Sequence, residues 1–171
     1  STQQIVGGLT MTARARTGGF DSPTLNLLSD MLVDSVTSLG QNVIWSHIGG
    51  FLYVTLPQTY NLDEMFDVSV FYHGHPTEGG FQGFAFDTHA GIPIVSTLSE
   101  PYMAQSWWPC KDTPSDKADS VDVIVTVNSA YYAVSNGLRR DSVDNGDGTT
   151  TYSWHLSYPI TTYLVSLAIT N

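Results

Sequence analysis

Apolar and polar residues alternate with a period of two in several separate stretches of this chain. In residues 9–16, the Leu, Met and Ala side chains fall on one face and the Thr and Arg side chains on the other. The same alternation occurs in residues 66–72, 121–127, 152–156 and 163–169. It is typical of β-strands that have one face in a core. Residues 51–57 (FLYVTLP) are apolar on both faces, which predicts a more central strand.

The segments between these stretches are rich in turn-forming residues. TGGFDSP, SHIGG, HGHPTEGG and DNGDG all combine Gly with Pro, Asn, Asp or Ser. Strands separated by such turns predict an all-β fold, a saddle-like antiparallel β-sandwich. Helical periodicity is weak, and we expect only a single helical turn near residues 115–118. There is no internal repeat or low-complexity linker, so we predict one domain over residues 1–171.

Residues 78–108 differ from the rest because they are rich in Gly and aromatic residues and have little periodicity. We expect a long irregular connection there, and such connections in compact domains are usually functional or interfacial.

Composition narrows the classes of partner. Apolar residues make up 42% of the chain, which is enough for a core, and 16 acidic against 6 basic residues give a net charge of −10. So few cations disfavour nucleic acid as a partner, because phosphate binding needs clustered Lys and Arg. The negative charge also opposes binding to anionic membranes. No run of about 18 apolar residues is present, so we expect no membrane span.

We predict no metal site in this chain. His73 and His75 in HGH can share a strand face, but no carboxylate lies at ligand spacing, and the sequence contains no H-E-x-x-H. DNGDG resembles a calcium loop only superficially, because the twelfth position is His155. Its Asn-Gly and Asp-Gly pairs instead predict a hairpin turn joining residues 138–143 to 149–154.

The two adjacent tryptophans and the single cysteine form the most unusual part of the sequence. Cys110 neighbours Lys111, but Pro109 and the tryptophans favour a packed thiol over a reactive one. In an extended chain, Trp107 and Trp108 point in different directions, so one is expected to enter the core. The other is suited to stacking on a sugar, together with Tyr102, or to sealing a domain interface. A carbohydrate-binding or adhesion sandwich is therefore an alternative function.

Glu100 stands at the end of an extended segment, directly before a proline and at the start of this loop. Most glutamates in such positions are solvated surface acids. A carboxylate at a loop mouth is also a candidate functional group, and composition alone favours the surface acid.

The stretch TLSEPYMAQSWWPCKDTPSDKADSVDVIVTV, with the later PITTYLVSLAITN, resembles the N-terminal domain of the zinc aminopeptidase family of aminopeptidase N and the leukotriene-pathway hydrolase. The likeness to the bacterial, secreted branch extends over nearly the whole chain. It implies a saddle-like β-sandwich that covers one side of an active site. It also implies that Glu100 holds the free α-amino group of the substrate. Leu98 stands where the family often has Gln, which implies an apolar lining of the first side-chain pocket, with Tyr102 as a further substrate contact.

The resemblance also assigns a structural role to the PCKDTP motif. The side chains that would fix the shape of this loop are Trp107, Trp108, Pro109, Cys110, Asp112 and Pro114. The sequence departs from the family at Gln105, where an Arg is usual, and at Met103, where a small residue is usual.

The resemblance places the chemistry in a second domain, because the zinc ligands and the general-base Glu of the family lie there. We therefore expect no catalysis and no cofactor in the isolated chain, with zinc in the catalytic domain of the same polypeptide. The implied partners are that domain and a peptide N-terminus, with an apolar surface around Glu100 for the contact. The branch implies a secreted or periplasmic protein. A non-catalytic relative that keeps the fold as a scaffold is a third possibility.

Overall fold

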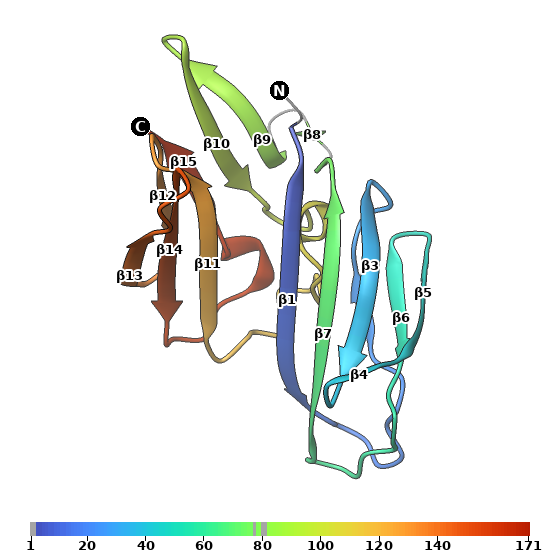
Figure 1. Cartoon of the computed structure of the whole chain (residues 1–171). Coiled ribbons are helices and arrows are strands. Elements are labelled where there is room, and N and C mark those ends of the chain that lie inside the picture. The colour runs from blue at the N-terminus through green and yellow to red at the C-terminus, as the bar shows by residue number, and fades with distance from the viewer. Residues whose placement is uncertain (1–2, 77, 80–81) are drawn as a thin grey trace. The chain divides into compact units, whose positions relative to one another are not determined.

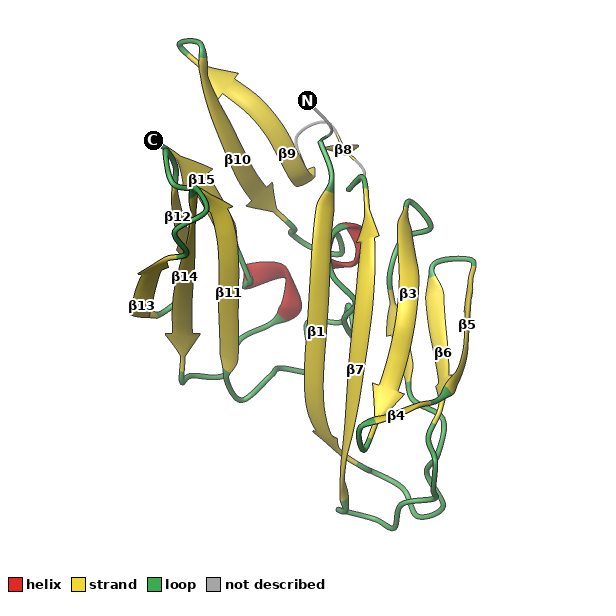
Figure 2. Cartoon of the chain, viewed as in Figure 1, coloured by secondary structure: helices red, strands yellow, loops and turns green. Residues whose placement is uncertain are grey.

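The computed structural model describes residues 3–76, 78–79 and 82–171 of the chain. It divides into two compact units: unit 1 comprises Ser1–Thr77 and Gln105–Lys111, and unit 2 comprises Glu78–Ala104 and Asp112–Asn171. The described residues form antiparallel strands and two short 3-10 helices, η1 (Ala104–Ser106) and η2 (Thr162–Leu164) (Figure 2). The predicted all-β antiparallel fold is confirmed. Each unit combines two separate stretches of chain. The prediction of a single domain stays a prediction.

Unit 1 contains two antiparallel sheets (Figure 1). The first has the strand order β1 (Ile5–Arg14), β7 (Met65–Gly74), β3 (Met31–Ser38) and β4 (Gln41–Asn42). The second has the order β2 (Thr24–Asn26), β6 (Phe51–Thr55) and β5 (Ile44–Ile48). One cluster of buried side chains, including Leu25, Leu52, Val68 and Val70, draws on both sheets. Each such side chain contributes roughly 1.5–3 kcal/mol by leaving water, so this shared core holds the two sheets together.

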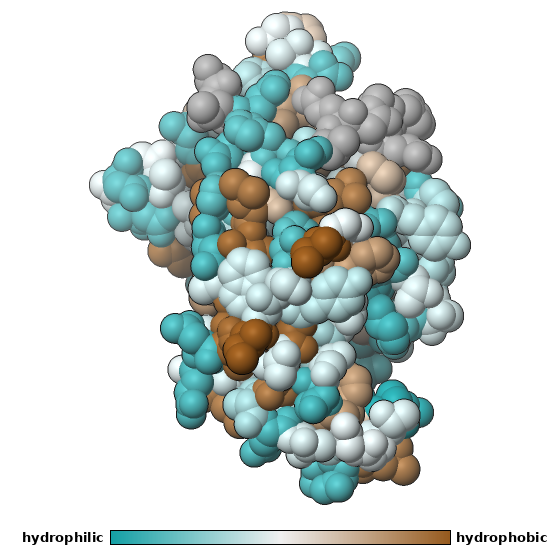
Figure 3. Space-filling view, turned by 90° about the vertical axis from the view of Figure 1, so that its right-hand side faces the viewer, coloured by the Kyte–Doolittle hydropathy of each residue, from teal (hydrophilic) through white to brown (hydrophobic). Residues whose placement is uncertain are grey.

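Strand β6 differs from its prediction in one respect. It lies between β2 and β5, as expected of a central strand, and its Leu52 and Val54 are buried. Its other face is not buried, since Phe51 remains 43% and Tyr53 47% exposed. Ile44 and Ile48 of β5 share this open face, and Figure 3 shows brown side chains on the side that carries β5 and β6. A three-stranded sheet packed on one side leaves its second apolar face in solvent.

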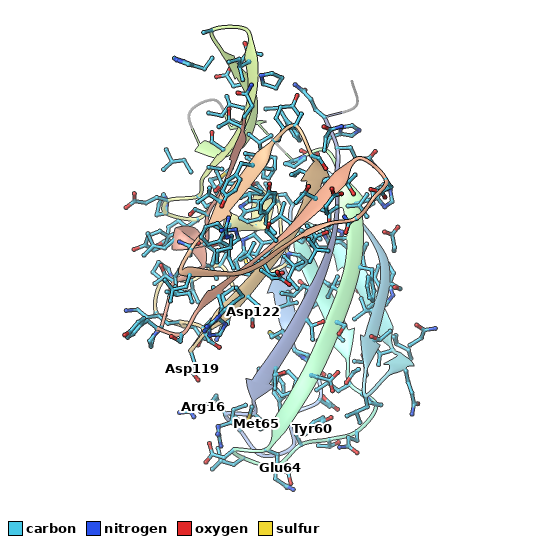
Figure 4. The ribbon with its side chains drawn as sticks, turned by 60° about the vertical axis from the view of Figure 1, so that its left-hand side comes forward. Arg16, Tyr60, Glu64, Met65, Asp119 and Asp122 are labelled. Carbon is cyan, nitrogen blue, oxygen red and sulfur yellow. The ribbon has the colours of Figure 1, made fainter. Side chains whose placement is uncertain are left out.

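The turn that joins β6 to β7 closes one end of the first sheet. Arg14 Nη1 donates to the carbonyl of Asp63, and Arg16 forms an exposed ion pair with the Asp63 carboxylate at 3.5 Å. The backbone and side-chain amides of Asn61 donate to the Glu64 carboxylate and lower its pKa. Figure 4 shows Arg16 and Glu64 at this end of β1 and β7.

Unit 2 also contains two antiparallel sheets. The first has the order β12 (Tyr132–Ser135), β15 (Leu167–Thr170), β10 (Ile92–Leu98), β9 (Gln82–His89) and β8 (Glu78–Gly79). The second has the order β11 (Val121–Asn128), β14 (Thr149–Leu156) and β13 (Leu138–Asp144). The ring of Tyr152 in β14 lies 4.7 Å from that of Tyr132 in β12, and Trp154 Nε1 donates to the Ala133 carbonyl. These contacts between β14 and β12 join the two sheets.

Three predictions about unit 2 are wrong in part. Residues 82–98 are not irregular but form the β9–β10 hairpin, with Ile92 paired to His89 and Leu98 to Gly83. The strand expected over residues 163–169 is reduced to β15, because residues 162–164 form η2. No helical turn forms at residues 115–118, where Ala118 instead pairs with Ile160 through two backbone hydrogen bonds.

The hairpin predicted for DNGDG is confirmed. Strands β13 and β14 flank it, and the Asn145 N–H donates to the Thr149 carbonyl at 3.0 Å. The hydroxyl and backbone N–H of Thr149 donate to the Asp147 carboxylate and lower its pKa. The Asp147 carboxylate therefore stabilises the turn itself.

Gly137 is predicted to be the most restrictive glycine of unit 2. Its φ is +86°, and a Cβ placed on it would clash with the backbone carbonyl of His155 in β14. Gly146 has a similar φ of +77° but open space around it. We expect Gly137→Ala to cost at least about 3 kcal/mol of unfolding free energy and Gly146→Ala only about 1 kcal/mol, measured by urea unfolding. Equal losses for the two variants would contradict the close approach at Gly137.

Candidate functional site

The candidate site begins where the central strand of the five-stranded sheet ends. Strand β10 pairs with β9 along its whole length, from Ile92 to Leu98, and with β15 through Val95 and Ser96. A strand paired on both edges is held more rigidly than a loop, so the residues that leave its end have a defined starting position.

Glu100 lies two residues beyond the end of β10. The preceding Ser99 is buried, and its carbonyl accepts a hydrogen bond from the Met103 N–H at 2.9 Å. This bond closes a tight turn, and the Glu100–Pro101 peptide within it is cis. Glu100 itself is exposed. In the part of the chain that the structure describes, its carboxylate has neither a hydrogen bond nor an ion pair. Its oxygens are therefore available to a ligand.

Leu98 and Tyr102 flank Glu100 along the chain with exposed apolar surface. Leu98, the last residue of β10, is 42% exposed, and Tyr102 is 55% exposed. Along the chain, one exposed carboxylate thus stands between two residues with exposed apolar surface.

The PCKDTP motif is placed in both units. In unit 1, Cys110 pairs with Asn26 of β2: each backbone N–H donates to the other residue's carbonyl, at 2.6 and 3.0 Å. The Leu28 N–H donates to the Gln105 carbonyl at 2.8 Å. Residues 105–111 therefore lie along the edge of the β2–β6–β5 sheet and supply partners that its edge strand would otherwise lack. In unit 2, the Thr162 hydroxyl donates to Asp112 Oδ1 at 3.2 Å, and Pro114 is half-buried.

The side chains of this motif in unit 1 are packed. Pro109 is fully buried, Cys110 is 3% exposed and Trp107 is 8% exposed, while Trp108 packs against the core of unit 1. The two indole rings meet edge to face, with centroids 6.0 Å apart. Both tryptophans are therefore packed within the protein, which disfavours the sugar-stacking alternative and leaves Tyr102 as its only exposed ring. Tyr72 of β7 is a buried titratable group that interacts with Cys110. Its burial raises the pKa of its hydroxyl, and Cys110 raises it further by a smaller amount.

Most of the histidines have structural partners. His73 Nδ1 lies 2.8 Å from the Asp34 carboxylate on the neighbouring strand, and His75 Nδ1 lies 2.7 Å from the Gln3 carbonyl. His155 and Asp122 form a similar cross-strand pair at 2.7 Å. Within residues 3–76, 78–79 and 82–171, no three His, Cys, Asp or Glu side chains are placed to hold a metal ion. The described part of the chain also has no helix long and apolar enough to cross a bilayer.

Two residues near the site were not singled out in the sequence. Thr97 lies within the stretch that carries the family resemblance, and its hydroxyl bonds to the backbone of Leu167. Asn136 bonds to the backbone of Leu164 and Ser166. The only sequence signal at Asn136 is an Asn-Gly pair, which predicts a turn rather than a bridge to a distant strand.

Comparison with known proteins identifies the family. The model of the peptidase M1 N-terminal domain matches residues 24–164. Leucine aminopeptidase 2 of Vanderwaltozyma polyspora is 37% identical over 81 residues, which is 47% of this chain and 12% of that protein. A crystal structure of the M1 zinc metallopeptidase from Deinococcus radiodurans superposes with a TM-score of 0.87 at 28% identity. That match covers 98% of this chain and 38% of the solved one.

A mutant of the same Deinococcus radiodurans enzyme, bound to a Tyr-Ser-Ala substrate, superposes with a TM-score of 0.86 at 28% identity and the same coverage. This chain thus spans well under half the length of the relatives it matches. The family match covers most of the chain. The superposition on the Deinococcus radiodurans structure covers 98% of it. The chain therefore belongs to the peptidase M1 N-terminal domain family.

Proposed function

We propose that this chain is the part of a zinc-dependent metallo-aminopeptidase that binds the free N-terminus of the peptide substrate through Glu100. The observation that carries the proposal is an exposed carboxylate without a partner among the described residues, placed at the end of a central strand. Membership of the M1 family supports it, as does the likeness to a metallopeptidase solved with a peptide substrate. The zinc and the hydrolytic step belong to a catalytic domain of the same polypeptide.

An aminopeptidase needs a group that recognises the free α-amino group of the first residue of the peptide. A carboxylate does so because it forms a charge-assisted hydrogen bond of about 2.7–2.9 Å to an ammonium group. An internal peptide nitrogen carries no charge, so it cannot take the place of the terminal ammonium group in this interaction. Glu100 is suited to this role because no hydrogen bond or ion pair to the described residues has to be broken before the ammonium binds.

Leu98 and Tyr102 would contribute the apolar part of the same site. Their exposed surface next to Glu100 suits the first side chain of the peptide, which lies close to its amino group. Apolar neighbours that exclude water also strengthen the carboxylate–ammonium attraction. From its resemblance to the bacterial secreted branch, we further propose that the parent protein is secreted or periplasmic.

Replacing Glu100 by Gln in the parent enzyme tests the proposal. We expect kcat/KM for Tyr-Ser-Ala to fall about 100-fold, because a neutral amide of the same shape loses the charge attraction to the ammonium. Asp119→Asn, which removes an exposed acid elsewhere in unit 2, is the matched control for net charge and should change kcat/KM by less than about twofold. Wild-type kcat/KM in Glu100→Gln would refute the assigned role.

The Leu98 side chain is expected to influence which first residue is preferred. In the parent enzyme, Leu98→Gln should lower the ratio of kcat/KM for leucine p-nitroanilide to that for arginine p-nitroanilide by about tenfold. Ile92→Gln, at the other end of β10 and on the same face, serves as the control. If both variants shift the ratio equally, or neither does, Leu98 does not line the pocket.

A further inference from the structure

The backbone pairing between β10 and β15 stops just before the candidate site. The paired residues are Val95 with Ile169 and Ser96 with Ala168. The same register would next bring Thr97 opposite Leu167. At that position a side-chain hydroxyl replaces the backbone acceptor: the Leu167 N–H donates to Thr97 Oγ1 at 2.9 Å. Leu167 is only 8% exposed, so a lost partner would leave a buried N–H unsatisfied.

A second set of side chains holds the start of β15 from the opposite edge. Asn136 Nδ2 donates to the Leu164 carbonyl at 2.9 Å, and Asn136 Oδ1 accepts from the Ser166 N–H at 2.7 Å. The hydroxyl of Ser135 donates to the Ser166 carbonyl at 2.7 Å. The backbone between η2 and β15 is therefore hydrogen-bonded by side chains where no ladder exists. This explains how β15 begins in a fixed position although it is only four residues long.

The same contacts define the end of β10. Leu98 is paired with Gly83 on the β9 edge, and Thr97 is bound to Leu167 on the β15 edge. Only two residues separate Thr97 from Glu100, and the turn between them is closed by the bond from Met103 to Ser99. With the β9 edge held up to Leu98 and the β15 edge up to Thr97, little backbone freedom remains before the carboxylate.

We propose that Thr97 is a positioning residue for Glu100, and that Asn136 supports it by fixing the backbone to which the Thr97 hydroxyl binds. This inference rests on the proposed role of Glu100 in binding the substrate's amino group. Thr97 touches no substrate atom. It acts by keeping the end of β10 against β15, so that the carboxylate meets the ammonium in a productive geometry.

A double-mutant cycle in the parent enzyme tests the inference. Thr97→Val keeps the shape of the side chain and removes the hydroxyl, whereas Thr97→Ser keeps the hydroxyl. We expect Thr97→Val to raise KM for Tyr-Ser-Ala about fivefold with kcat changed less than about twofold, and Thr97→Ser to restore KM. In a Glu100→Gln background, Thr97→Val should have no further effect on KM, because the positioned group is gone.

Amide hydrogen exchange provides a readout that does not depend on catalysis. In Thr97→Val, the Leu167 N–H should exchange at least about tenfold faster than in the wild type, while the amides of the β11–β14–β13 sheet stay unchanged. If Thr97→Val does not fold, Asn136→Asp replaces it in the cycle. That variant keeps the acceptor for Ser166 and loses the donor to Leu164, and it should raise KM only when Glu100 is present.

The outcomes separate this inference from the function on which it rests. An unchanged KM and kcat in Glu100→Gln overturns the proposed function, and the positioning role with it. A large effect of Glu100→Gln combined with equal effects of Thr97→Val in both backgrounds overturns only the positioning role. Failure of Thr97→Ser to restore KM, or unchanged exchange at Leu167, also overturns it.

Discussion

The placement of Glu100 depends on how the backbone of β10 is paired in unit 2. A strand in the middle of a sheet has hydrogen-bonding neighbours on both edges, and β10 has β9 on one and β15 on the other. Its last residues would lose the second neighbour, because the β15 ladder stops at Ser96. The hydroxyl of Thr97 makes up for that loss by binding Leu167. Since a buried N–H without a partner costs about 1–3 kcal/mol, this single bond favours one position of the strand end strongly.

The loop that follows β10 contains both the exposed Glu100 and the buried tryptophan, proline and cysteine residues of the PCKDTP region. Its first part, around Glu100, remains in solvent and carries exposed apolar side chains. Its later part, residues 105–111, is anchored in unit 1 by backbone pairing with β2 and by buried Trp107, Pro109 and Cys110. The exposed and the buried residues of this connection thus lie in different stretches, the former in unit 2 and the latter in unit 1.

The strands that the sequence predicted are those with one face in a core. Phe66, Val68 and Val70 of β7 alternate with the polar Asp67 and Ser69, and the structure buries each of the three apolar side chains. The β9–β10 hairpin was missed because β10 is half-exposed on both faces, so its sequence has no alternation to detect. The start of the strand expected at residues 163–169 lies later in the structure for another reason. There the side chain of Asn136, which is distant in sequence, occupies the backbone groups that a ladder would use.

The most direct test of the central claim is a crystal structure of the parent protein with a bound peptide that has a free amino terminus. The account predicts one Glu100 carboxylate oxygen within about 3 Å of the peptide's amino nitrogen, with Leu98 against the first side chain. It would be contradicted by an amino nitrogen held entirely by other residues while the Glu100 carboxylate points into solvent.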